Sequence, residues 1–203
     1  IKLLKIDAID VLINNAGALF LNRETNSAGV EKTFALNHLS YFHLTLGLVE
    51  KLKINKDSRI INVASNAHKR YSIDVNDLEN TISYNGWKAY CRSKLLNILF
   101  TYSFNRKMNV DINCNCLHPG FVNSNFGNNN SSTYRFFVNI AKNLFAISND
   151  RAAELSVYLA LSKDIKDITG KYFVNFKIKK SSKMSYDIAL ADQVWDKSLK
   201  YIK

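Results

Sequence analysis

The sequence predicts an α/β fold built on a doubly wound, parallel β-sheet. Short apolar runs alternate with amphipathic stretches that are long enough to form helices. Parallel strands need crossover connections of about a dozen residues or more, which are usually helices. Such crossovers are right-handed, so we expect helices on both faces of the sheet. At 203 residues, of which 47% are hydrophobic, the chain has the size of one domain.

The first part of the chain supplies two strands and one helix. Residues 7–17, DAIDVLINNAG, contain a buried strand that ends at an Asn-Asn-Ala-Gly turn. Apolar residues recur with helical period across 30–52, so this stretch is predicted to be a helix. Residues 58–65 form a β-branched strand, and residues 66–85 are polar and irregular.

The second part continues the alternation of helices and strands. A long helix is predicted over 85–108, and the strand after it, 110–120, is stopped by Pro119, the one proline of the chain. The remaining segments, in order, are a loop at 127–132, amphipathic stretches at 133–146 and 150–162, a strand at 170–176 and a helix at 187–201.

Composition excludes some classes of protein. The net charge is +11, but the lysines are scattered and no aromatic-basic motif occurs, so we expect a solvated lysine-rich surface and no nucleic-acid partner. The three cysteines do not pair by number and show no C-x-x-C spacing, so we expect free thiols and no metal site. No run of 18 apolar residues and no signal-peptide pattern is present.

Polar and turn-forming residues follow three of the predicted strands. They are residues 14–17, Ser65 and residues 118–120. In a doubly wound sheet, ligands bind beyond the carboxyl ends of the strands. Tyr90 and Lys94 begin the helix after the Ser65 strand, and Asn37 lies in the helix before it, so the topology can bring all of these groups to one crevice.

The four-residue spacing of Tyr90 and Lys94 has a chemical reason. A free tyrosine has a pKa near 10 and is a poor acid or base at neutral pH. A cation one helical turn away favours the phenolate, and lowering the pKa to about 7 requires roughly 4 kcal/mol. We therefore predict that Lys94 lowers the pKa of Tyr90, that Ser65 holds a substrate oxygen beside it, and that Asn37 holds a water in line with Lys94.

These motifs together resemble the short-chain dehydrogenase/reductase family. The matching stretches, in the family's order, are NNAG, Asn37 within LNHLSYFHLT, Ser65 after RIINVA, YCRSK and HPGFVNS. A lone Y-x-x-x-K is a weak signal, but five ordered motifs on suitable elements are a strong one. The stretches AYCRSKLLNILF, LHPGFVNS and ITGKYF are further similar to the retinol dehydrogenase branch, of the retinal-reductase type.

The resemblance implies a Rossmann-like fold and a role for each matching residue. The implied catalytic residues are Asn37, Ser65, Tyr90 and Lys94, with Tyr90 as the acid/base. The implied cofactor-binding residues are Asn15, Ala16, Gly17, Asn37, Tyr90, Lys94, Pro119, Gly120 and Val122. His38, His43 and His68 show no ligand spacing and are interpreted as ordinary helix and loop residues.

One departure from the family pattern is large. The family binds the cofactor pyrophosphate with a glycine-rich turn at a helix N-terminus. The glycines here stand at 17, 29, 47, 86, 120, 127 and 170, and none are close enough to form that turn. We therefore expect residues 1–203 to be the C-terminal part of a single, N-terminally incomplete domain that lacks roughly 60–90 residues.

The resemblance implies an oxidoreductase that transfers a hydride between NADP(H), favoured over NAD(H), and a hydrophobic alcohol or aldehyde such as a retinoid or lipid carbonyl. The alternative is a catalytically silent binding protein, or an inactive fragment without the pyrophosphate site. Residues 133–147 are interpreted either as a helix packed on the core or as a substrate lid that faces a membrane surface.

The exact substrate, the direction of the reaction and a homo-oligomeric state stay open. We expect an intracellular protein, either cytoplasmic or associated with the endoplasmic reticulum membrane. The choice is undecided because members of this branch often carry an N-terminal anchor, and this sequence does not contain that segment.

Overall fold

The computed structural model describes residues 6–120 and 148–202, and contains a five-stranded sheet in the order β1-β2-β3-β4-β5. The strands are β1 Val11–Asn14, β2 Arg59–Val63, β3 Asn113–His118, β4 Tyr172–Val174 and β5 Lys177–Ile178. The first four strands are parallel to one another. The predicted α/β fold with a parallel sheet is therefore confirmed.

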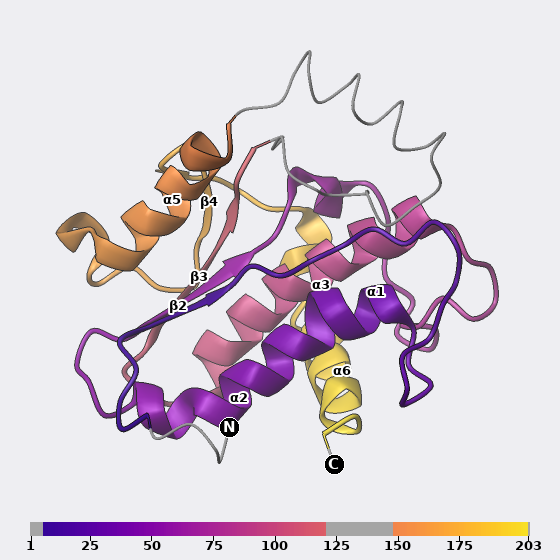
Figure 1. Ribbon diagram of the computed structural model, residues 1–203, viewed down its shortest axis with the longest axis horizontal. Coiled ribbons are helices and arrows are strands. Elements are labelled where there is room, and N and C mark those ends of the chain that lie inside the picture. The colour runs from indigo at the N-terminus through magenta and orange to yellow at the C-terminus, as the bar shows by residue number, and fades with distance from the viewer. Residues whose placement is uncertain (1–5, 121–147, 203) are drawn as a thin grey trace.

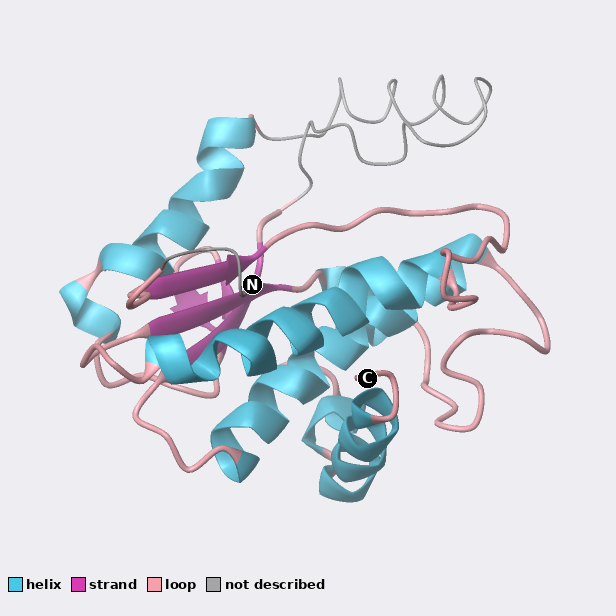
Figure 2. Ribbon diagram, turned by 60° about the horizontal axis from the view of Figure 1, so that its bottom comes forward, coloured by secondary structure: helices cyan, strands magenta, loops and turns pink. Residues whose placement is uncertain are grey.

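Helices cover both faces of this sheet. They are α1 Lys32–Phe34, α2 Ser40–Leu52, α3 Gly86–Lys107, α5 Asn149–Leu161 and α6 Ile188–Leu199. Figures 1 and 2 show α2, α3 and α6 on one side of the strands and α5 on the other. The arrangement is doubly wound, as the right-handed crossovers predict.

The period-two alternation of β2 supplies both cores. Ile60 packs in one apolar cluster with Phe42 and Phe100 of the helices α2 and α3. Its neighbour Ile61 points to the opposite face and packs in a second cluster with Leu159 of α5. Both isoleucines are at most 1% exposed, so β2 is buried on its two faces, as parallel strands usually are.

Buried polar side chains link β1 to β2 and to both helices behind them. Nδ2 of Asn14 donates hydrogen bonds to Oγ1 of Thr45 at 3.0 Å and to Oδ1 of Asn62 at 2.8 Å. Nδ2 of Asn62 donates in turn to Oγ1 of Thr101 at 3.0 Å. Because buried amides without partners are costly, these bonds favour the register in which Asn14 stands beside Asn62. Asn14 is thus a structural residue.

Two of the predicted elements differ from the structure. The predicted helix 30–52 contains a π-helical turn, Ala35–Leu39, between α1 and α2. The predicted last strand stops at Val174, because Asn175 and Phe176 adopt φ of 49° and 61° and turn the chain back. The short strand β5 that follows is antiparallel to β4 and was not predicted. Two consecutive residues with positive φ are typical of a tight hairpin turn.

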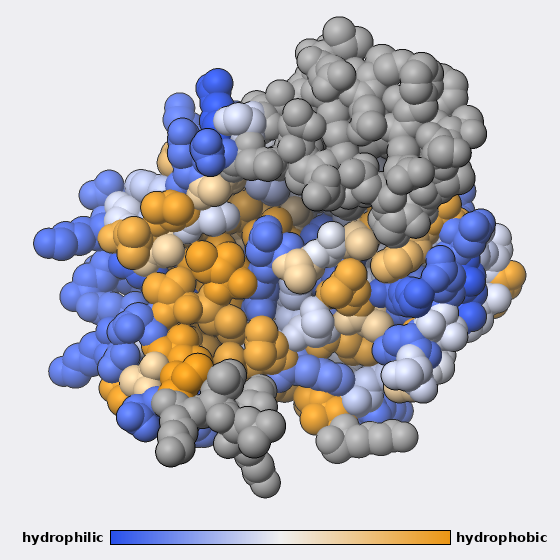
Figure 3. Space-filling view, viewed as in Figure 1, coloured by the Kyte–Doolittle hydropathy of each residue, from blue (hydrophilic) through white to orange (hydrophobic). Residues whose placement is uncertain are grey.

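The strand β1 lies at the edge of the described sheet, where it pairs with β2 alone. Ile13 in this strand is 42% exposed although it continues an apolar run. Figure 3 shows apolar side chains gathered over this part of the sheet, between α5 and α2. Among the described residues, β1 is thus an edge strand with an exposed apolar side chain.

Some of the predictions concern residues outside the described ranges. These include Val122 and the amphipathic stretch 133–147, so the predicted substrate lid and membrane contact stay predictions. Within the described ranges, no helix has the length and apolar character needed to cross a bilayer. No three His, Cys, Asp or Glu side chains of the described residues gather closely enough to hold a metal ion.

Candidate active site

The carboxyl ends of β1 and β2 bring the predicted site residues together. The loop after β1 passes so close to the π-helical turn and to α3 that a Cβ on Gly17 would lie 3.3 Å from both Oδ1 of Asn37 and Nζ of Lys94. Asn37 and Lys94 come from the π-helical turn before α2 and from α3, respectively. Three segments that are distant in the sequence therefore meet at Gly17, where only a hydrogen fits without displacement.

The Asn37 side chain links the loop after β1 to α3 through hydrogen bonds. It is fully buried, and its Oδ1 accepts a hydrogen bond from the Ala18 amide at 2.9 Å. Its Nδ2 donates to the Ala18 carbonyl at 2.9 Å and to Oγ of Ser93 at 3.0 Å. Both amide hydrogens are therefore engaged, and they are not available to hold the water that we predicted. The role of Asn37 in a proton relay stays a prediction.

Lys94 is a buried cation at the end of β2. It is 3% exposed, and its Nζ donates a hydrogen bond to the Val63 carbonyl at 3.1 Å. Burial lowers its pKa to about 8 because desolvation disfavours the charged form. Its Nζ lies 5.7 Å from the ring centre of Tyr90 and 5.8 Å from that of Tyr41. The ammonium thus lies beside the tyrosine rings within a poorly solvated site.

The predicted lowering of the Tyr90 pKa is wrong for this structure. Burial raises the pKa of Tyr90 to about 12, and the hydrogen bond with the Ser65 side chain only partly opposes this. The hydrogen bond of Lys94 goes to the backbone of β2, and its ammonium faces the tyrosine ring from 5.7 Å. Tyr90 is therefore a neutral phenol at pH 7, which suits it to donate a proton to a carbonyl oxygen.

Ser65 has both a structural and a site role. It is the N-cap of the 3-10 helix Asn66–Lys69, and its Oγ accepts a hydrogen bond from the Ala67 amide at 3.2 Å. The same hydroxyl group bonds with Tyr90 and lowers the pKa of that tyrosine. The turn after β2 thus presents Ser65 directly to the first turns of α3, as the sequence analysis expected.

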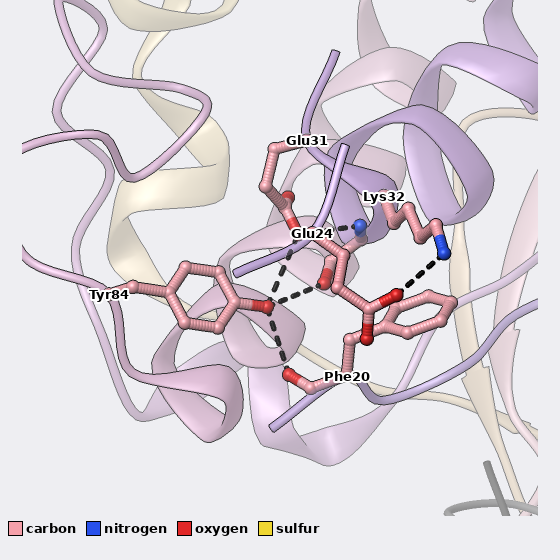
Figure 4. Close-up of polar contacts among 6 residues, drawn as sticks. Phe20, Glu24, Glu31, Lys32 and Tyr84 are labelled. Carbon is pink, nitrogen blue, oxygen red and sulfur yellow. Dashed lines mark hydrogen bonds and ion pairs between the residues drawn. The ribbon is translucent and has the colours of Figure 1, made fainter. Parts of the chain in front are cut away.

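The start of α3 is held by close contacts with the loop that follows β1. The Asn85 side chain caps the helix by accepting a hydrogen bond from the Lys88 amide at 2.9 Å. The Tyr84 hydroxyl shares its one hydrogen between the Phe20 carbonyl oxygen at 2.9 Å and the buried Glu31 carboxylate at 3.2 Å (Figure 4). These contacts fix the helix turn that carries Tyr90.

A second anchor at the same place is the close approach of Gly86, the first residue of α3, to the backbone. A Cβ on Gly86 would lie 2.2 Å from the Phe20 carbonyl oxygen and 2.8 Å from Cα of Leu21. We predict that Gly86→Ala lowers the free energy of unfolding by about 1–3 kcal/mol, since a backbone clash forces both segments apart. Chemical denaturation measures this loss.

The matched control for this substitution is Gly47→Ala, at an exposed position inside α2. An added methyl group there raises the free energy of unfolding by about 0.5–1 kcal/mol, because alanine favours the helix. If Gly86→Ala were as stable as Gly47→Ala, the close approach at the start of α3 would not exist.

The predicted cofactor-binding residues line the open side of this site. Asn15, Ala16 and Gly17 are exposed after β1. Pro119 and Gly120 are half-buried after β3, and Gly120 has φ of 97°, which favours glycine. Their positions at the carboxyl ends of two parallel strands are those at which nucleotides bind in doubly wound sheets. Cofactor contacts from these residues stay predictions.

His68 was predicted to be an ordinary loop residue, but in the structure it is buried and both of its ring nitrogens have partners. His68 is 1% exposed and lies three residues after Ser65 in the same turn. Its Nδ1 lies 2.6 Å from the Ser65 carbonyl oxygen, and its Nε2 lies 3.0 Å from the Ser182 amide. The signal that could have revealed it is its spacing from Ser65 in a short capped turn.

Comparisons with known proteins agree with this geometry. Residues 3–135 match a family model described as short chain dehydrogenase. The chain is 36% identical to human retinol dehydrogenase 13, covering 97% of this chain and 61% of that protein. It is 34% identical to the chloroplastic short-chain dehydrogenase TIC 32 A of Brassica napus, covering 96% of this chain and 64% of that protein. The chain thus spans about three fifths of the length of these relatives.

Solved structures show the same fold. A protein from Mycobacterium paratuberculosis matches with a TM-score of 0.75 at 25% identity, covering 97% of this chain and 68% of that chain. The angucycline C-6 ketoreductase LanV, solved with bound NADP, matches with a TM-score of 0.60 at 20% identity, covering 82% of this chain and 60% of that chain. The second similarity is informative about the fold alone.

Proposed function

The chain belongs to the short-chain dehydrogenase family, and we propose that it carries the catalytic part of an oxidoreductase that interconverts hydrophobic alcohols and aldehydes with NADP(H). The observation that carries the proposal is the cluster at the carboxyl end of β2, where Tyr90 bonds with Ser65 and has the Lys94 ammonium 5.7 Å from its ring centre. Retinoids and lipid carbonyls are the proposed substrates, in keeping with the similarity to human retinol dehydrogenase 13.

The residues present fit a nicotinamide cofactor. Gly17 is exposed and has no side chain to stand between a ligand and the Lys94 ammonium, which a Cβ there would approach to 3.3 Å. A buried ammonium and exposed backbone groups after β1 are suitable donors for ribose hydroxyls and a carboxamide. Asn15, Ala16, Gly17, Lys94, Pro119 and Gly120 would hold the cofactor, which when bound supplies or accepts the hydride. NADP(H) is proposed over NAD(H) because of the resemblance to the retinol dehydrogenase branch.

In this proposal, side chains of this chain donate the proton and stabilise the charge that results. In the direction of reduction, the Tyr90 hydroxyl donates its proton to the carbonyl oxygen as charge develops there. The Ser65 hydroxyl, already bonded with Tyr90, holds the same oxygen in place. The Lys94 ammonium stabilises the resulting phenolate, since an opposite charge favours the ionised form. The pKa of Lys94, about 8, allows the lysine to exchange a proton near neutral pH.

An apolar substrate is supported by the surroundings of Tyr90. The Trp87 ring is stacked on the Tyr90 ring with 5.6 Å between centroids and an interplanar angle of 22°. Trp87 is nevertheless 43% exposed, which is a large apolar surface next to the proposed acid. A large aromatic surface at a site usually contacts an apolar part of the ligand.

We further propose that residues 1–203 form part of one domain whose phosphate-binding turn lies outside this sequence. The absence of a glycine-rich turn in the sequence and the exposed apolar edge at β1 support this. We predict that the isolated segment binds NADPH at least about 10²-fold more weakly than the full-length protein, because its sequence has no glycine-rich turn to bind the pyrophosphate. Fluorescence titration of both proteins measures this difference, and equal affinities would contradict it.

Activity assays with the full-length protein test the proposed function. Retinal, a long-chain aldehyde and a short polar aldehyde are compared, each with NADPH and with NADH. We expect reduction of the apolar substrates with NADPH, and a loss of this activity in Ser65→Ala. Cofactor binding without turnover of any substrate would favour the alternative, a catalytically silent binding protein.

A further inference from the structure

The turn that presents Ser65 has a partner in the C-terminal part of the chain. The carbonyl oxygen of Ser65 lies 3.1 Å from the backbone amide of His68 and 2.6 Å from its ring Nδ1. The other ring nitrogen, Nε2, lies 3.0 Å from the backbone amide of Ser182. Ser182 lies 114 residues further along the chain than His68 and immediately precedes the 3-10 helix Lys183–Tyr186.

These contacts fix the chemical state of His68. A backbone amide can only donate, so Nε2 must be unprotonated and accept the hydrogen bond from Ser182. The ring proton then lies on Nδ1, which donates it to the Ser65 carbonyl oxygen. One neutral tautomer satisfies both bonds, and the charged imidazolium satisfies only one. Burial lowers the pKa of His68 below its ordinary value of 6.5, which favours this neutral state.

Neighbouring groups from each surrounding element support the same arrangement. The Tyr172 ring on β4 meets the His68 ring edge to face at 5.1 Å, and its hydroxyl donates to Oδ1 of Asn66 at 2.9 Å. Two cationic or titratable groups also face His68: Lys69 on its own turn and His118 at the end of β3. The Lys69 ammonium disfavours a positive charge on His68, whereas His118 is neutral because burial lowers its pKa to about 4. The Ser65 turn is thus held on two sides by β4 and by the Ser182 segment.

We propose that His68 is a positioning residue, which holds the Ser65 hydroxyl against Tyr90 by linking the Ser65 carbonyl to the Ser182 amide. This inference rests on the proposed function, because it assumes that Ser65 and Tyr90 act on the substrate. His68 touches neither substrate nor cofactor in this account. It acts through the geometry of the Ser65 turn, where a misplacement of about 1 Å can cost 10²-fold in rate.

Two substitutions in the full-length protein remove the link from opposite ends. His68→Asn keeps a donor for the Ser65 carbonyl but is too short to reach Ser182. Ser182→Pro deletes the amide hydrogen together with the Ser182 hydroxyl, and the Ser182 φ of −67° is one that proline adopts. We expect each to lower kcat by about tenfold or more with little change in the KM for the cofactor, and the double variant to lose no more than either alone.

The matched control is Ser182→Ala. It retains the amide hydrogen and deletes only a hydroxyl that has no hydrogen-bond partner among the described residues. We expect Ser182→Ala to keep the parent's kcat. Equal losses in the alanine and proline variants, or a parent-like kcat in both His68→Asn and Ser182→Pro, would overturn the inference.

The pH profile separates positioning from mere stabilisation of the fold. The parent's kcat should fall as the pH drops through the lowered pKa of His68, which lies below the ordinary histidine value, because protonated His68 turns a donor toward the Ser182 amide. His118 does not interfere, since burial lowers its pKa to about 4. This decrease in kcat at low pH should be absent from both His68→Asn and Ser182→Pro. The thermal unfolding of both variants is measured in parallel to check their folding. A fall that persists unchanged in both variants contradicts the proposal.

Ser65→Ala and Tyr90→Phe are measured alongside to distinguish the two hypotheses. If these variants retain activity, the proposed function itself is wrong. If they are inactive while His68→Asn and Ser182→Pro behave as the parent, only the role of His68 is wrong. Should His68→Asn fail to fold, Ser182→Pro and its alanine control still decide between the outcomes.

Discussion

Replacing Tyr90 by phenylalanine in the full-length protein is expected to lower kcat by about 10²–10⁴-fold, the range typical of a lost general acid. The substitution removes the hydroxyl that bonds with Ser65 and keeps the ring that stacks on Trp87. The dissociation constant of NADPH should therefore stay nearly unchanged. Steady-state rates of aldehyde reduction and fluorescence titration of the cofactor measure the two quantities separately.

The control for this prediction is Tyr71→Phe, a tyrosine that is 39% exposed and outside the site. It should retain the parent's kcat. The same loss in both variants would show that the Tyr90 effect is not specific. A Tyr90→Phe enzyme within about tenfold of the parent would remove this residue from the acid role, because general acid catalysis is worth more than that.

The pH dependence of this reaction follows from the state of Tyr90. Burial raises the pKa of the phenol to about 12, so the hydroxyl is protonated at every pH at which reduction would be assayed. Reduction therefore needs no prior protonation of Tyr90. Oxidation of an alcohol needs the phenolate as a base, and a phenol with this pKa is almost entirely protonated at neutral pH. In the proposed function, this pKa suits Tyr90 to the role of proton donor in aldehyde reduction.

Much of the fold was predictable because its signals are local. The β-branched run that ends at Val63 and the helical period of α3 need no knowledge of distant residues. The hairpin between β4 and β5 was missed because it depends on positive φ at Asn175 and Phe176. Asparagine tolerates that conformation, but phenylalanine gives no sequence signal for it. The π-helical turn around Asn37 likewise has no periodic signature in the sequence.

The sequence predicted which residues gather at the candidate site, but it did not predict the pKa of Tyr90. The order of the motifs places Ser65, Tyr90 and Asn37 near one another because parallel strands share an edge. Whether Lys94 lowers or fails to lower the pKa of Tyr90 depends on burial and on where its ammonium points. The four-residue spacing of Tyr90 and Lys94 predicts neither the burial of the site nor the direction of the ammonium. His68 escaped notice for a related reason, since its partner Ser182 is far away in the sequence.

Replacing Lys94 by methionine is expected to have opposite effects on activity and on stability. Methionine has a similar length but cannot stabilise the Tyr90 phenolate, so kcat should fall by about 10²-fold or more, as for other lost electrostatic groups. The folded protein should nevertheless become more stable at pH 7. Burial depresses the pKa of Lys94 from 10.5 to about 8, a difference equivalent to about 3 kcal/mol of destabilisation by the buried charge.

The sign of this effect gives it a distinctive pH dependence. Between pH 8 and pH 10.5 the unfolded chain binds more protons at Lys94 than the folded chain, so the parent's stability rises with pH in that window. The Lys94→Met protein lacks this rise. Its advantage in free energy of unfolding should be largest below pH 8 and shrink as the pH approaches 10.5.

Chemical denaturation at several pH values decides the question, with Lys51→Met, an exposed lysine on α2, as the control. The control should show neither the gain in stability nor the loss of activity. A Lys94→Met protein that is less stable than the parent at pH 7 would mean that the ammonium is fully compensated by its bond to Val63. A buried cation that costs stability and supports turnover is the combination expected of a residue kept for chemistry, because protein sites commonly trade stability for activity.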